Sequence, residues 1–125
     1  MKNTINNTNT NELNLINIGL IMNIGLYKIQ IEKIQTIFSK YLEVENAILF
    51  GSRAKGNFRK NSDIDIALKG DISLSIRNKI FNDLEELNLY CDVDLVVFDK
   101  IDNQELIKHI ERVGISLFNR NDYSQ

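Results

Sequence analysis

The sequence is short of the residues that commonly cross-link a fold or hold a structural metal. Its 125 residues include one cysteine, one histidine, no proline and no tryptophan. Cys91 cannot form a disulfide within the chain, so a reducing, cytoplasmic compartment is expected. A structural zinc site is excluded because such sites take several Cys and His ligands, and the chain has one of each.

A surplus of positive charge is also missing. Lys and Arg number 15 and Asp and Glu number 17, which gives a formal net charge of −2. Proteins that bind nucleic acid or acidic membranes through their general surface carry a basic surplus. We therefore expect no direct nucleic-acid partner, and a basic patch only locally.

No hydrophobic run is long enough to span a membrane. The most apolar stretch near the N-terminus, Leu13–Leu26, is interrupted by Asn14, Asn17 and Asn23. It is also shorter than the roughly 20 residues that a membrane-spanning helix needs, and no signal-peptide cleavage site follows it. We therefore expect no membrane association.

The chain divides by composition into three parts. Residues 1–25 are rich in asparagine and predict a flexible N-terminal extension. Residues 26–120 carry regular hydrophobic patterns and predict one minimal domain, and residues 121–125 form a short C-terminal tail. With 43% hydrophobic and 26% charged residues, the composition is that of an ordinary globular protein.

Hydrophobic periodicity predicts alternating helices and strands within that domain. Apolar residues at spacings of three and four indicate helices, and short apolar runs bounded by glycine or polar residues indicate strands. The expected order is helix 27–42, strand 47–50, strand 64–68, helix 73–88, strand 91–98, helix 104–113 and strand 115–118. This order predicts an α/β or α+β domain, a small mixed sheet flanked by helices.

Two aspartates at the start of a predicted strand are the first sign of chemistry. Asp63 and Asp65 lie two residues apart, so their side chains leave the same face of the strand. Two adjacent carboxylates repel each other, and strands disfavour aspartate. A divalent cation offsets both effects, and Mg²⁺ prefers such oxygen ligands. An exposed polar strand face is the plainer alternative.

A third carboxylate follows on a later strand. Asp94 lies within a Val- and Leu-rich run, and adjacent strands of a small sheet would bring it to the first two aspartates. Asp92 lies on the same strand face and is the competing candidate. We prefer Asp94 because it lies deeper in the apolar run, although an edge-strand charge that prevents aggregation has the same appearance.

Polar and basic residues follow the first predicted strand. Gly51 permits a tight turn, and Ser52 is a good N-cap for a short helix whose free N–H groups bind phosphate. Alone, this pair is weak evidence, since many capped turns look alike. Four basic residues lie between Ser52 and Asp63 and suit either a solvated loop or the neutralisation of a triphosphate: Arg53, Lys55, Arg59 and Lys60.

Taken together, these features resemble the DNA polymerase beta-like nucleotidyltransferase superfamily, and more closely its minimal nucleotidyltransferase (MNT) branch. The resemblance is carried by Phe50-Gly51-Ser52-Arg53-Ala54-Lys55-Gly56, by Ser62-Asp63-Ile64-Asp65-Ile66-Ala67 and by Val93-Asp94-Leu95-Val96. It covers about residues 26–120. It implies the nucleotidyltransferase fold in a single minimal domain.

The resemblance also implies a reaction, the transfer of AMP from ATP to a hydroxyl group. Two Mg²⁺ ions held by Asp63, Asp65 and Asp94 would align the attacking and leaving oxygens. Asp94 would accept the proton of the acceptor. No covalent enzyme intermediate is needed, so Cys91 and His109 receive no part, and His109 is expected at the surface.

The nucleotide would be held by the glycine-serine motif. The resemblance implies that Gly51 and Ser52 hold the β- and γ-phosphates of ATP. Arg53 or Lys55 would add positive charge beside them.

The MNT branch is usually paired with a small helical HEPN protein, an RNase toxin. The resemblance therefore implies an antitoxin that places AMP on a tyrosine of that toxin. Two alternatives stay open: a non-catalytic antitoxin that masks its partner, and a nucleotidyltransferase for a small molecule such as an aminoglycoside.

Overall fold

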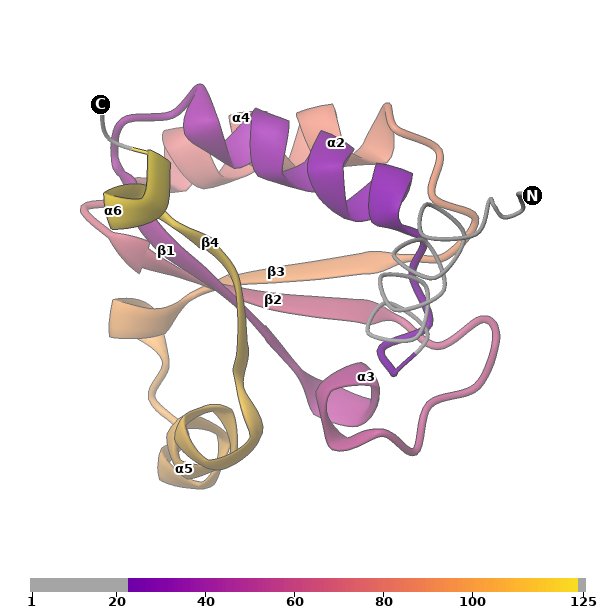
Figure 1. The fold of residues 1–125 in the computed structure, drawn as a ribbon. Helices are drawn as coiled ribbons and strands as arrows, with labels where there is room; N and C mark the ends of the chain where they lie inside the picture. Colours follow the sequence, from indigo (N-terminus) through magenta and orange to yellow (C-terminus); the bar gives the residue numbers. More distant parts are fainter. Residues whose placement is uncertain (1–22, 124–125) are drawn as a thin grey trace.

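The computed structural model describes residues 23–123 (Figure 1). The sequence predicts that the N-terminal extension, residues 1–25, is flexible. Nearly all of these residues lie outside the described range. Ile24 and Leu26 are 7% and 3% exposed and belong to the hydrophobic core. The described fold therefore begins ahead of residue 26, the expected start of the domain.

The seven predicted helices and strands follow one another in the predicted order, and further short helices lie between or after them. The elements are α2 (Lys28–Ser39), β1 (Val44–Phe50), α3 (Gly51–Lys55), β2 (Ile64–Gly70), α4 (Leu74–Glu85), β3 (Val93–Val97), η1 (Phe98–Lys100), α5 (Gln104–Val113), β4 (Ile115–Asn119) and α6 (Arg120–Tyr123). None of the described helices is both long and apolar enough to cross a membrane.

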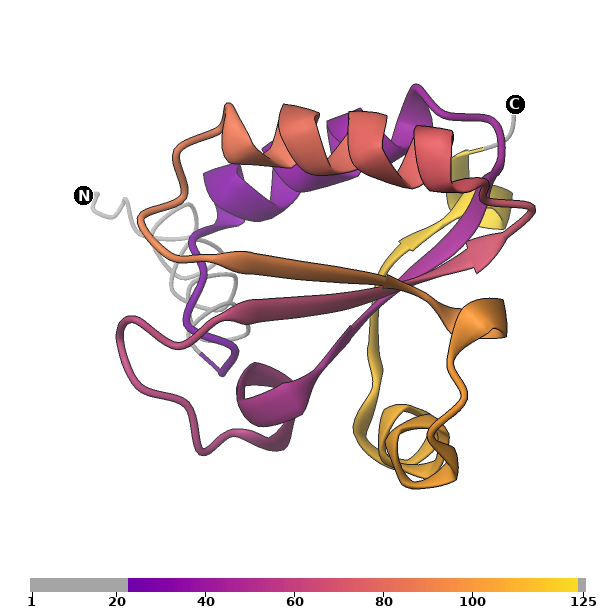
Figure 2. The ribbon, with the colours of Figure 1, turned by 180° about the vertical axis from the view of Figure 1, so that it is seen from behind.

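Four strands form one mixed sheet in the order β3-β2-β1-β4. Strands β2 and β3 are parallel and are joined through α4, whereas β1 runs antiparallel to both β2 and β4. The mixed α/β fold class predicted from the sequence is confirmed. Figures 1 and 2 show α2 and α4 side by side over one face of this sheet.

The face beneath α2 and α4 holds the main core. Alternation along β2 directs Ile64, Ile66 and Leu68 to this face, and all three are fully buried. The helices supply apolar residues at helical spacing, such as Phe38 from α2 and Ile80 from α4, both also at 0% exposure. Each such side chain removed from water contributes about 1.5–3 kcal/mol.

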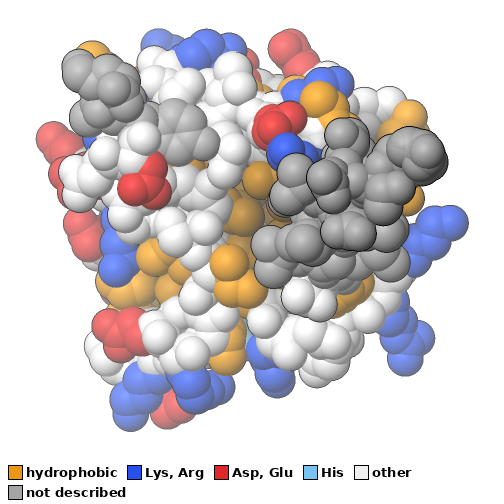
Figure 3. All heavy atoms as spheres, viewed as in Figure 1, with side chains coloured by type: hydrophobic (Ala, Val, Ile, Leu, Met, Phe, Trp, Pro, Cys, Tyr) orange, Lys and Arg blue, Asp and Glu red, His pale blue; other side chains and the backbone are white. Residues whose placement is uncertain are grey.

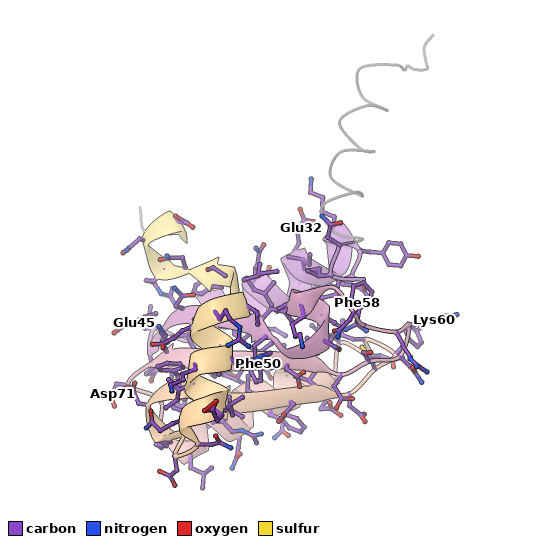
Figure 4. The ribbon with its side chains drawn as sticks, turned by 90° about the horizontal axis from the view of Figure 1, so that it is seen from below. Glu32, Glu45, Phe50, Phe58, Lys60 and Asp71 are labelled. Atoms are coloured by element: carbon purple, nitrogen blue, oxygen red, sulfur yellow. The ribbon has the colours of Figure 1, made fainter. Side chains whose placement is uncertain are left out.

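The opposite face is covered only in part. A smaller cluster joins Phe50, Ala67 and Ile110, so α5 packs where β1 and β2 carry apolar residues. Seen from below, α5 lies across this side of the sheet, with Phe50 close to it (Figure 4). The remainder of this face carries the aspartates, because alternation gives Asp65 and Ala67 the same direction along β2.

Two helices are shorter than their hydrophobic periodicity predicts. The first, α2, ends at Ser39 with Lys40 as its C-cap, ahead of the expected residue 42. The other, α4, is capped by the Ser73 side chain and ends at Glu85, ahead of the expected residue 88. Asn88 and Tyr90 have φ values of 54° and 65°, and this left-handed backbone turns the chain toward β3.

Candidate active site

Parallel pairing of β2 and β3 places two of the predicted aspartates side by side. Asp65 is the register partner of Asp94, and Ile66 pairs with Leu95. Neighbouring strands lie about 4.8 Å apart, so these two carboxyl groups leave the same face from adjacent backbones. Asp63 lies two residues before Asp65 and shares that face. The structure thus brings the three predicted carboxylates to one end of the open face.

The register also separates Asp94 from its competitor. Asp92 lies before the first residue of β3, and its backbone carbonyl accepts the N–H of Ile64 at 2.8 Å. Asp94 lies within the strand, directly opposite Asp65. The geometry therefore favours Asp94 as the third carboxylate of the cluster.

Crowding of these carboxylates changes the proton affinity of the central one. The pKa of Asp65 is raised from 3.8 to about 6, first by burial and then by the negative charges of Asp94 and Asp63. The positive charge of Arg53 lowers the pKa but does not offset these effects. Asp65 is half-buried, whereas Asp63 and Asp94 are exposed.

The donor set suits a hard divalent cation. Among residues 23–123, no three Asp, Glu, His or Cys side chains already converge into a ready-made metal cage. Three carboxylates on adjacent strands are nevertheless the ligand type that Mg²⁺ takes. The repulsion that raises the Asp65 pKa is what a bound cation would relieve, so Asp63, Asp65 and Asp94 fit such an ion.

Gly51 joins the glycine-serine motif to the acidic cluster. It is the first residue of α3 and has a φ of 74°, a conformation that other residues rarely adopt. A Cβ atom at this position would collide with the Asp65 Oδ2 atom. The close approach of the loop to Asp65 therefore requires glycine.

The short helix begins two residues earlier than expected, at Gly51 instead of Arg53. Its N-cap is Phe50, and Ser52 lies in the first turn instead of capping it. The expectation of a Ser52 cap is wrong because the left-handed Gly51 already turns the chain into the helix. Ser52 remains partly exposed and adjacent to Gly51 at the acidic end of the face.

Arg53 does not point outward, as a basic residue in a polar loop would. It is 1% exposed, and its guanidinium donates to the carbonyl oxygens of Ile24 at 2.9 Å and Ser62 at 2.8 Å. Further bonds reach the carbonyls of Gly25 and Lys60. These contacts correct the expectation that Arg53 meets a phosphate: its donors tie the segment before α2 to the loop that leads into Asp63.

The flat side of the Arg53 guanidinium group is also in contact with another side chain. Phe58 lies under the guanidinium, with its ring centroid 5.4 Å from Cζ, and Figure 4 shows Phe58 and Lys60 on the loop between α3 and β2. Lys55, at the end of α3, is exposed. Of the two predicted phosphate-binding cations, Lys55 is therefore the one free to meet a ligand. Figure 3 shows Lys and Arg side chains along the lower edge of the molecule, where α3 and α5 lie.

His109 contacts the glycine-serine motif, which its sequence position alone does not predict. It was expected at the surface, but it is half-buried, and its Nε2 atom accepts the Gly51 N–H at 3.0 Å. Its ring meets the Phe50 ring edge-on, with centroids 6.1 Å apart. A signal was present in the sequence, since His109 follows Leu106 by three residues and so lies on the packed side of α5.

Comparison with known proteins identifies the family. The chain matches the family model described as polymerase beta, nucleotidyltransferase, over residues 32–123. The chain belongs to this nucleotidyltransferase family. The match contains the glycine-serine motif and all three aspartates of the cluster. Comparison with curated protein sequences finds no match.

Solved structures of toxin–antitoxin complexes share the nucleotidyltransferase fold. A chain of a toxin–antitoxin complex with AMP-PNP is 26% identical, with a TM-score of 0.61; the alignment covers 74% of this chain and 77% of that one. A chain of the MntA–HepT complex is 24% identical, with a TM-score of 0.57 and coverages of 76% and 75%. The third is a chain of the tri-AMPylated Shewanella oneidensis HEPN toxin in complex with MNT antitoxin, at 23% identity, TM-score 0.57 and coverages of 77% and 76%.

Proposed function

We propose that this nucleotidyltransferase transfers AMP from ATP to a tyrosine hydroxyl of a HEPN-type RNase toxin and thereby acts as its antitoxin. The observation that carries the proposal is the Asp65–Asp94 register pair, with Asp63 beside it and Gly51 against Asp65. The likeness at 26% identity to a chain of a toxin–antitoxin complex that contains AMP-PNP supports the choice of ATP and of a toxin partner.

The acidic cluster is assigned to metal and acceptor. Asp63, Asp65 and Asp94 would hold Mg²⁺, two ions being expected. When bound, Mg²⁺ supplies positive charge to the phosphates and lowers the pKa of the attacking hydroxyl. Asp94 lies on the more exposed strand of the pair and is assigned to accept the proton of the acceptor hydroxyl.

The loop at Gly51 and Ser52 is assigned to the β- and γ-phosphates. Gly51 lets the backbone approach the Asp65 carboxylate, so a triphosphate bound at this loop would lie beside the acidic cluster. Lys55 adds positive charge at the end of α3. Arg53 acts indirectly, because its hydrogen bonds hold the loop that positions Asp63.

The bond changes follow from these positions. The acceptor oxygen forms a bond to the α-phosphorus, and the bond from that phosphorus to the α,β-bridging oxygen breaks. Pyrophosphate leaves, held at the loop of Ser52, and the acceptor proton passes to Asp94. The exposure of Asp63 and Asp94 leaves this face open to a side chain of another protein.

A cytoplasmic location is a prediction that rests on the single Cys91.

The test is direct modification of a candidate toxin. The full chain is purified together with a candidate HEPN-type protein, and the pair is incubated with ATP and Mg²⁺. We expect the partner to gain the mass of one or more AMP groups and to lose RNase activity. An inactive but unmodified partner would indicate masking, and AMP transfer to aminoglycosides alone would indicate a small-molecule acceptor; either result would contradict the proposal.

A further inference from the structure

His109 contacts the glycine-serine motif, yet the proposed mechanism assigns it no part. Its Nε2 atom accepts the Gly51 N–H at 3.0 Å, which requires a neutral ring with its proton on Nδ1. Burial, followed by the positive charges of Arg112 and Lys55, lowers the pKa of His109. The ring is therefore neutral at physiological pH and remains an acceptor.

Gly51 is held from two sides. The Asp65 carboxylate lies against its Cα, where a Cβ would collide, and His109 holds its amide. The edge-on contact with Phe50 restricts the His109 ring in turn. The orientation of the Phe50–Gly51 peptide is thus set jointly by α5 and β2, although neither element contains the motif.

We propose that His109 is a positioning residue for the nucleotide: by accepting the Gly51 N–H, it fixes the peptide that leads into α3, so that Ser52 faces the β- and γ-phosphates. The Gly51 amide is then engaged within the protein, and Gly51 supplies the turn and the close approach instead of a phosphate contact. This inference rests on the proposed function of the glycine-serine loop.

Two substitutions separate the hydrogen bond from the bulk of the side chain. In His109→Gln, the amide oxygen can take the place of Nε2 as an acceptor, whereas His109→Leu fills similar space without one. The matched control is Lys108→Ala, which removes the exposed neighbouring side chain on α5. All variants are made in the full chain, and their melting temperatures are compared first.

Amide hydrogen exchange tests the contact without nucleotide. We expect the Gly51 amide to exchange slowly in the wild type, in His109→Gln and in Lys108→Ala, and at least about 3-fold faster in His109→Leu. Equal exchange in the Leu variant would show that His109 does not hold this amide, and would overturn the inference.

Nucleotide binding tests the consequence. With Mg²⁺ present, His109→Leu should bind AMP-PNP about 3- to 10-fold more weakly than the wild type, the range expected for one lost hydrogen bond. Its affinity for AMP, which lacks the β- and γ-phosphates, should be unchanged. His109→Gln should restore AMP-PNP affinity to within about 2-fold of wild type.

The outcomes distinguish this inference from the function on which it rests. Unchanged AMP-PNP affinity in His109→Leu, equal weakening of AMP and AMP-PNP, or a Gln variant as weak as Leu would each overturn the positioning role alone. A wild-type chain that binds no AMP-PNP would overturn the proposed function, and the positioning role with it, whatever the exchange of Gly51 shows.

Discussion

The two faces of the sheet are built from the same strands, but one carries buried apolar side chains and the other carries carboxylates. On the face under α2 and α4, residues such as Ile64 and Ile66 are fully buried. On the other face, the alternating positions carry Asp63 and Asp65, and α5 covers only the region around Ala67. One face therefore stabilises the fold, while the other retains an unfavourable cluster of carboxylates suited to chemistry.

This division predicts that activity and stability can be lost separately. A substitution on the open face should abolish transfer without harming the fold, and a substitution on the closed face should do the reverse.

Asp65→Asn should reduce AMP transfer by at least about 1,000-fold, because it removes the central metal ligand. The same change should leave the melting temperature unchanged or raise it, since the burial and repulsion that raise the Asp65 pKa to about 6 act on the ionised group. Transfer rates and thermal unfolding of the two proteins check both points. A variant that transfers AMP at near wild-type rates would contradict the assignment of the site.

Phe38→Ala should lower the free energy of unfolding by about 3–5 kcal/mol, because it leaves a cavity under α2. Phe38 is fully buried, and its ring lies 6.0 Å from that of Phe118. Denaturant titration measures the loss. The fraction that stays folded should retain AMP-PNP affinity; a selective loss of binding would show that the two faces are not independent.

Asp94→Ala should slow transfer by about 100-fold, whereas Asp92→Ala should have little effect. The reason is register: Asp94 lies opposite Asp65, and Asp92 lies before the strand. Nucleotide binding should survive better in Asp94→Ala than in Asp65→Asn, since Asp94 is assigned to the acceptor side. The opposite ranking of the two alanine variants would make Asp92 the third carboxylate.

The stability of the metal-free protein should depend on pH through Asp65. Its pKa is raised from 3.8 to about 6, so the folded state holds this proton more tightly than the unfolded chain. The stabilisation is fully present below pH 3.8 and is lost as the pH rises through about 6. Unfolding measured in EDTA should show this trend as the difference between wild type and Asp65→Asn; a difference independent of pH would contradict it.

Tyr41→Phe should lower the free energy of unfolding by about 1 kcal/mol, the smallest of these effects. The Tyr41 hydroxyl donates to the Asp83 carboxylate at 2.6 Å, and this bond, followed by burial, raises the Tyr41 pKa from 10.0 to about 12. The stabilisation is present below pH 10.0 and is lost as the pH rises through about 12. Thermal unfolding at neutral pH tests the cost, and transfer should be unaffected.

The fold could be predicted from local patterns because each helix or strand shows its own hydrophobic periodicity. The helix at residues 104–113 has the predicted bounds, and strand alternation correctly separates Ile64 and Ile66 from the aspartates. The C-terminal end of α4 could not be predicted by periodicity, which continues through Leu87 beyond the last helical residue, Glu85.

The site could be predicted only where its residues share a motif or a strand. The two-residue spacing at the start of β2 predicts that Asp63 and Asp65 share one face, but the approach of Asp94 depends on which strands pair. The roles of Arg53 and His109 depend on tertiary contacts: Arg53 bonds to the Ile24 carbonyl, 29 residues away, and His109 reaches the Gly51 amide, 58 residues away. Helical spacing from Leu106 places His109 on the packed side of α5, but no local pattern identifies the groups that Arg53 and His109 contact.

The fate of the ATP phosphates tests the central claim most directly. The chain and its partner are incubated with Mg²⁺ and ATP labelled at either the α- or the γ-phosphate, and label on the partner is measured for wild type and for Asp65→Asn. A nucleotidyltransferase site predicts α-label on the partner, γ-label only in released pyrophosphate, and neither label on the partner with Asp65→Asn. Transfer of γ-label to the partner, or α-label transfer that persists in Asp65→Asn, would contradict the assignment of this face.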